Sequence, residues 1–113
     1  MALAVKTRKE KGMPVIELVG RVIDVDVLKF TKKLEELSKK PPAYIVIDVS
    51  RSNFIDSHGL GSIVYYHNML QKKSCKLLIL NTNTDPNNYV TRLIELTNLN
   101  KVLNIVLDLE EIK

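Results

Sequence analysis

Residues 43–49 form a nearly continuous apolar run, AYIVIDV, that is rich in β-branched side chains. A strand with one wet face alternates apolar and polar residues, whereas a strand inside a parallel sheet contacts apolar neighbours on both faces. The run therefore predicts a strand that is buried on both faces. Because parallel strands are joined by crossovers that are usually helices, such a strand favours an α/β fold.

The rest of the chain supplies elements that fit this expectation. Residues 50–53 are turn formers and predict a loop after the buried strand. The order β-β-α-β-α-β-α-β-α predicts a mixed, mostly parallel sheet of four to five strands, with helices packed on it and an antiparallel hairpin at one edge. The other elements are expected as strands at 3–9 and 14–22, a helix from Asp24 or Asp26 to just before Pro41, a helix at 57–73, a strand at 76–80, a helix at 86–97, a strand at 102–107 and a short helix at 108–113.

Composition limits the classes of protein to consider. The 113 residues are 45% hydrophobic and 27% charged, which predicts one globular domain spanning residues 1–113. No apolar run approaches the roughly 18 residues that span a bilayer, and no signal peptide is evident, so we expect a cytoplasmic protein without membrane contact. The basic residues behind the net charge of +4 are scattered, which argues against direct nucleic-acid binding. Cys75 stands alone, and neither a metal nor a cofactor is expected.

Ser57 stands where a strand should end and the next helix should begin. The apolar residues that follow recur at helical spacing, which puts Ser57 at or near a helix N-terminus. The free amides and the positive end of the helix dipole can receive an anion there, such as a phosphate. Asp56 can cap the same helix, and it can also orient the serine hydroxyl toward a nucleotide phosphate. The apolar stripe consists of Leu60, Ile63, Val64, His67 and Leu70, and His67 is expected to be a core residue.

Gly59 and Gly61 lie at the start of this helix, where each lowers helix stability by roughly 1 kcal/mol relative to alanine. Two glycines at this place suggest that something approaches the backbone closely. A partner protein and tight packing against the sheet would each explain them.

Three segments of the chain resemble the signature of anti-sigma factor antagonists in the STAS domain superfamily. They are Asp48-Val49-Ser50, Phe54-Ile55-Asp56-Ser57 and Gly59-Leu60-Gly61, and residues 97–103 are similar to the segment that leads to that family's final strand. The resemblance implies a STAS domain whose serine, here Ser57, is phosphorylated by a partner that is both a serine kinase and an anti-sigma factor. The unphosphorylated form then binds this partner and frees a sigma factor, and a serine phosphatase removes the phosphate.

The resemblance also implies a neighbourhood for the phosphorylation site. The family's glycine-x-x-aspartate near the first helix is matched by residues 20–24, with the aspartate one position later. That difference leaves open whether Asp24 reaches the serine. The neighbourhood comprises Asp24, Asp56, His58, Gly59, Leu60 and Gly61.

A second stripe on the helix after Ser57 resembles a protein-binding surface, because it combines tyrosine and methionine beside the serine. The alternative is that one of the tyrosines packs under a neighbouring helix. The residues of the stripe are Ser62, Tyr65, Tyr66 and Met69, and they continue from His58.

Two other functions are weighed against the phosphoswitch. A STAS module can also serve as a scaffold of a signalling assembly or as an accessory module of a lipid or anion transport system, without a phosphoswitch. A hydrolase that uses Ser57 with a histidine is disfavoured, because the Gly-x-Ser-x-Gly turn is missing and the adjacent Ser57 and His58 point in different directions on a helix. We therefore expect a binding protein and not an enzyme.

Overall fold

The computed structural model describes residues 3–111, and its centre is a mixed β-sheet in which six strands take part. The strand order is β1-β2-β3-β5-β6, with β4 paired to β2 off this path. β1 and β2 are antiparallel, and every other pair is parallel. The predicted α/β fold with an edge hairpin is confirmed. The strands are β1 (Ala4–Glu10), β2 (Met13–Val22), β3 (Tyr44–Asp48), β4 (Ser52–Ile55), β5 (Lys76–Leu80) and β6 (Asn104–Val106).

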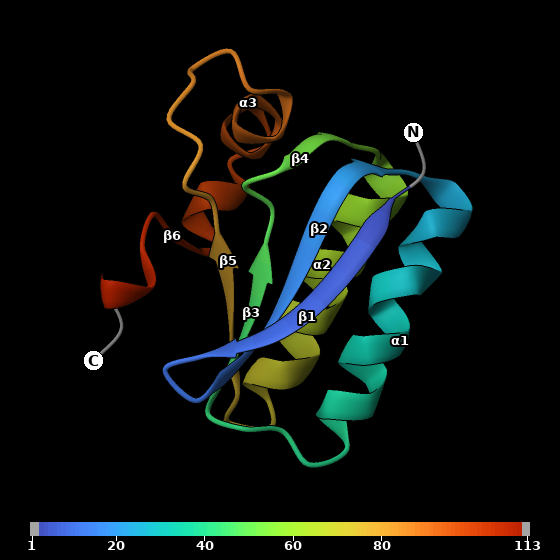
Figure 1. Ribbon diagram of the computed structural model, residues 1–113, viewed down its shortest axis with the longest axis vertical. Helices are drawn as coiled ribbons and strands as arrows, with labels where there is room; N and C mark the ends of the chain where they lie inside the picture. The colour runs from blue at the N-terminus through green and yellow to red at the C-terminus, as the bar shows by residue number, and fades with distance from the viewer. Residues whose placement is uncertain (1–2, 112–113) are drawn as a thin grey trace.

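The helices cover one face of this sheet and one of its ends. In Figure 1 the hairpin of β1 and β2 lies in front of α2, and α3 lies beside β4 at the top. The apolar sides of α1 and α2 meet inward-facing strand residues such as Ile16, Ile47 and Ile79 in the main core. The helices are α1 (Val27–Ser38), α2 (Ser57–Gln71) and α3 (Tyr89–Leu96), with 3-10 turns η1 (Asp24–Asp26), η2 (Leu99–Lys101) and η3 (Leu109–Glu111).

Strand β4 occupies part of the segment that was predicted to be a loop. It pairs in parallel with the end of β2, where Gly20 is opposite Ser52. Ser52 is 2% exposed, and its hydroxyl lies 3.0 Å from the carbonyl oxygen of Gly20, to which it donates. A polar side chain is therefore stable at this buried position, and the turn-forming residues at 50–53 did not reveal the strand because its partner is distant in sequence.

Two predicted boundaries were wrong. The helix expected from residue 86 begins at Tyr89, because Asn88 caps it by accepting a hydrogen bond from Thr91 N at 3.0 Å. The predicted start of the first helix is confirmed, since Asp26 is the N-cap residue of α1. The 3-10 turn η1 precedes it, and neither that turn nor α1 has a side-chain cap. The last strand covers only Asn104–Val106. Of the expected terminal helix, the 3-10 turn η3 is present, and residues 112–113 lie outside the described residues.

Candidate functional site

The site is built around the turn from β4 into α2. Asp56 is the N-cap residue of α2, and its Oδ1 accepts a hydrogen bond from Gly59 N at 2.8 Å. Its backbone N–H donates to the carbonyl oxygen of Val22 at 3.0 Å, which holds the turn against the end of β2. The capping role predicted for Asp56 is confirmed, and the start of α2 is tied to the sheet at this point.

Asp24 reaches the same turn in spite of its shifted position in the sequence. Its backbone N–H donates to Asp56 Oδ2 at 2.9 Å, and its own Oδ1 lies 4.0 Å from His58 Nδ1. The backbone of Asp24 is in the left-handed region, with φ of 40°, which aspartate tolerates better than most residues. A strained turn after β2 thus brings Asp24, Asp56 and His58 together.

Hydrogen bonds lower the pKa of Asp56. The largest contribution comes from the Gly59 N–H, and the Asp24 N–H and the imidazole of His58 also favour the ionised carboxylate, while partial burial opposes them. Asp56 is therefore a carboxylate at neutral pH, and it already accepts bonds on both of its oxygens.

Ser57 is the first residue of α2 and is exposed. Within residues 3–111 its hydroxyl has no hydrogen-bond partner, because Asp56 and not Ser57 caps the helix. The hydroxyl is thus not needed for the fold. It faces solvent at the positive end of a helix dipole, where an added phosphate is stabilised.

The two glycines differ in what surrounds them. A Cβ atom on Gly59 would lie 2.8 Å from Val22 Cγ1 and 2.9 Å from Ile55 Cγ1, so tight packing against the sheet requires glycine there. A Cβ atom on Gly61 would have no heavy atom within 4 Å, and Gly61 is exposed. Packing explains the first glycine, and nothing within the described chain explains the second.

The proposed binding stripe on α2 is only partly exposed. Tyr65 is 60% exposed, whereas Tyr66 is 9% exposed and donates its hydroxyl to Glu35 Oε2 of α1 at 2.9 Å. Burial and, after it, the Glu35 carboxylate raise the pKa of Tyr66 to about 12. The expectation that Tyr66 lies on an exposed surface was wrong, and the alternative that it packs under a neighbouring helix is confirmed. The two rings still touch, edge to face, with centroids 5.1 Å apart.

The other residues of the stripe also face inward in part. Ser62 is half-buried and donates its hydroxyl to the carbonyl oxygen of His58 at 2.9 Å. Met69 is half-buried against the main core, and Leu60 belongs to that core with 8% exposure. The exposed line on α2 that continues from the serine consists of Ser57, His58, Gly61, Tyr65 and Asn68.

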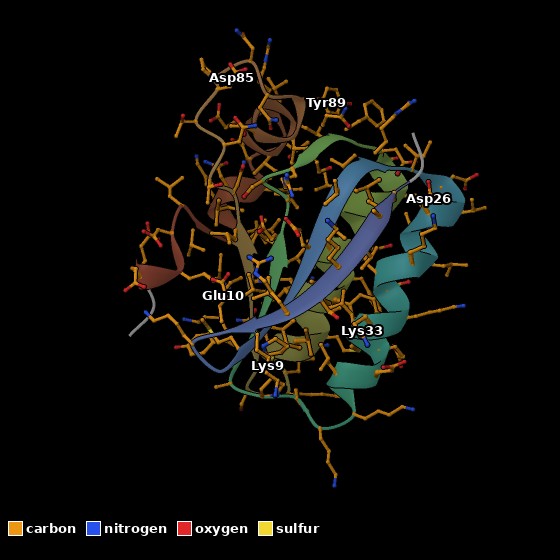
Figure 2. The ribbon with its side chains drawn as sticks, viewed as in Figure 1. Lys9, Glu10, Asp26, Lys33, Asp85 and Tyr89 are labelled. Carbon is orange, nitrogen blue, oxygen red and sulfur yellow. The ribbon has the colours of Figure 1, made fainter. Side chains whose placement is uncertain are left out.

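An aromatic cluster beside the site was not predicted from the sequence. The rings of Phe54 in β4 and Tyr89 in α3 are stacked, with centroids 4.6 Å apart, and the Arg21 guanidinium lies 5.2 Å from the centre of the Phe54 ring. Figure 2 shows Tyr89 at the α3 end of the molecule. Only tertiary structure brings these residues together. The one sequence signal is Phe54 itself, because an aromatic residue three positions before Ser57 is typical of a binding surface.

The described residues offer neither a metal site nor a membrane span. Within residues 3–111, no three side chains of the His, Cys, Asp or Glu type gather closely enough to hold a metal ion. None of the helices in that part of the chain is long and apolar enough to cross a membrane.

Comparison with known families identifies the fold. The model of the STAS domain matches residues 4–112. This chain belongs to the STAS domain family. The family resemblance carried by residues 48–61 is thereby confirmed, although no curated protein matches the sequence.

Solved structures of anti-sigma factor antagonists have the same fold. One from Mycobacterium paratuberculosis is 22% identical, with a TM-score of 0.72 over 96% of this chain and 89% of that one. SpoIIAA in its unphosphorylated form is 17% identical, with a TM-score of 0.69 over 96% of this chain and 92% of that one. The phosphorylated form of the Bacillus cell fate determinant SpoIIAA is 18% identical, with a TM-score of 0.70 over 96% of both chains. At these identities the likeness establishes the fold.

Proposed function

We propose that this STAS domain is an anti-sigma factor antagonist controlled by phosphorylation of Ser57. In its unphosphorylated form it binds an anti-sigma factor that is also a serine kinase, and a sigma factor is released. Phosphorylation by that kinase ends the binding, and a serine phosphatase restores it. The domain acts in the cytoplasm as a binding module without catalysis of its own.

The observation that carries this proposal is the exposed Ser57 hydroxyl without a partner. A serine that only began a helix would use its hydroxyl to satisfy a free amide, but Asp56 does this for Gly59 N. Ser57 can therefore be modified without loss of a bond in the fold. Solved structures of a phosphorylated and an unphosphorylated SpoIIAA with the same fold support the choice of this chemistry.

The switch acts at the surface and not through the fold. Phosphorylation adds a charge of about −1.5 to −2, next to a turn that already carries Asp24 and Asp56. A partner surface shaped around a neutral hydroxyl would then face three neighbouring anions, which lowers affinity by on the order of a few kcal/mol. The exposed line of α2, with Gly61 and Tyr65, supplies the adjoining contact surface.

Two variants of the serine test the switch. Ser57→Ala should bind the partner kinase and resist phosphorylation, whereas Ser57→Asp should fold normally and bind it at least tenfold more weakly, which is about 1.4 kcal/mol. Ser74→Asp is the control for an added charge, since Ser74 is exposed just after the other end of α2. Isothermal titration calorimetry against the kinase measures all three. Equal affinity of the Ala and Asp variants would refute the switch.

Mass spectrometry provides an independent test. The protein purified from its own cells should contain a fraction that carries one phosphate, and peptide mapping should locate it on Ser57. If no phosphate is found there, even after incubation with the partner kinase and ATP, the scaffold or accessory role without a phosphoswitch replaces the proposal.

A further inference from the structure

A cavity of about 580 Å³ lies at the end of α2 that is remote from Ser57. It is lined by His67 and Gln71 of α2, by Tyr44 and Lys76 at the starts of β3 and β5, and by Val102 and Asn104 before and in β6. His67 is ten residues after Ser57, which is about 15 Å along the helix axis. The volume is within the range of small-molecule sites, about 300–1,000 Å³.

His67 lacks the hydrogen bond that its burial calls for. It is 7% exposed, and neither of its ring nitrogens has a partner within residues 3–111, with Nδ1 shut off from solvent. The other buried polar side chains of this part of the chain are all bonded: Ser38 to Glu35, Ser52 to Gly20, Asn81 to Thr91, and Asp48 to Arg8. A buried imidazole without a partner is unusual, because each nitrogen is a donor or an acceptor. Within the same residues Nε2 also lacks a partner but is not enclosed in this way, so it is the ring nitrogen that can meet a polar ligand in the cavity.

The charge of the wall indicates the kind of ligand. Among the described residues, Lys76 is the charged residue in the wall, and no aspartate or glutamate lines it. At the end of α2, the carbonyl oxygen of Leu70 is already used, since it accepts from Lys73 N at 2.8 Å and from Cys75 N at 3.0 Å. A positive wall with amide and hydroxyl donors is complementary to an anion.

The wall also has an apolar part. Val102 and Leu77 line it, and Val102 is 50% exposed, which leaves apolar surface open at the mouth. Pockets of this kind bind molecules that combine a few polar groups with an apolar body.

We infer that this cavity binds a small organic anion, in which a carboxylate or phosphate is held by Lys76 and His67 and an apolar group lies against Leu77 and Val102. Gln71 and Asn104 supply further polar contacts. The site is separate from Ser57 and does not depend on the switch.

Titration of the isotope-labelled protein followed by NMR tests the inference. The probes are benzoate, phenyl phosphate and the neutral benzamide, each added to about 10 mM. Benzoate or phenyl phosphate should give saturable shifts of the backbone amides of Tyr44, Gln71, Lys76 and Asn104, and the stronger of the two identifies the preferred anion. Benzamide should bind at least tenfold more weakly.

Three variants complete the experiment. Lys76→Gln and His67→Phe should each weaken binding of the anion, by roughly three- to tenfold for the lysine. Lys72→Gln is the matched control, an exposed lysine near the cavity that does not line it, and it should bind as the unmodified protein does. The inference is overturned if neither anion gives saturable shifts at these amides, if benzamide binds as well as benzoate, or if Lys72→Gln and Lys76→Gln have equal effects.

Discussion

Gly59→Ala and Gly61→Ala form a matched pair in which the same chemical change meets two different surroundings. In a helix interior, glycine to alanine stabilises by roughly 1 kcal/mol. Gly61→Ala should realise this gain, because its Cβ atom would have no heavy atom within 4 Å. Gly59→Ala places a methyl group 2.8 Å from Val22 Cγ1 and 2.9 Å from Ile55 Cγ1.

The cost at Gly59 follows from the rigidity of its neighbours. Val22 and Ile55 are 0% and 1% exposed, and their branched side chains have few alternative rotamers, so the start of α2 must shift instead. Such overpacking costs about 1–3 kcal/mol. After the gain in helix propensity, Gly59→Ala should be destabilised by up to about 2 kcal/mol, and the two variants should differ by about 1–3 kcal/mol.

Urea unfolding followed by circular dichroism measures this difference. With an m-value of about 1–3 kcal/mol per molar urea, the midpoints of the two variants should be on the order of 1 M apart, with Gly61→Ala the higher. If both variants are stabilised to the same extent, the close contact of Gly59 with the sheet is refuted. Binding of the partner kinase by Gly61→Ala provides a separate result, since a loss of affinity in a stabilised variant would locate the partner at this glycine.

The remaining predictions concern the cap and the two tyrosines. Asp56→Ala should lower the unfolding free energy by about 0.5–2 kcal/mol at neutral pH. The folded-state pKa of Asp56 is depressed, so this stabilisation is present above the unfolded pKa near 3.8 and is lost as the pH falls through the lower folded pKa. The urea midpoints of Asp56→Ala and of the unmodified protein should therefore converge in acid. An unchanged difference between the two midpoints would contradict the capping role. Tyr66→Phe removes the bond to Glu35 and should cost about 1 kcal/mol in thermal or urea unfolding, whereas an unchanged stability would mean that the bond has no net effect. Tyr65→Ala should leave the melting temperature nearly unchanged and weaken binding of the partner kinase; a large drop in melting temperature would show that Tyr65 is part of the core.

Local patterns in the sequence were sufficient to predict the buried strand β3 and the start of helix α2, which position the site. The apolar run at 43–49 became β3, and the cap residue Asp56 was correctly placed at the start of a helix. Helical periodicity also identified Leu60 and His67 as core residues. These features depend on residues a few positions apart, where helix and strand geometry is regular.

Contacts between distant residues had to come from the tertiary structure. Periodicity alone could not separate Tyr65 from Tyr66, because adjacent residues of a helix differ by about 100° and the position of α1 decides which of them is covered. Strand β4 was likewise missed, because the strand it pairs with, β2, is distant in the sequence and no local pattern reveals that pairing.

The sequence by itself determined the family, the order of strands and helices apart from β4, and the position of a serine at the start of α2. Tertiary structure decided that Asp24 reaches Asp56 across 32 residues, that Gly59 touches the sheet, and that a buried His67 lines a cavity. The physical reason is the range of the interactions. Caps and helical stripes are made within one or two turns, whereas contacts across the sheet depend on how the whole chain packs.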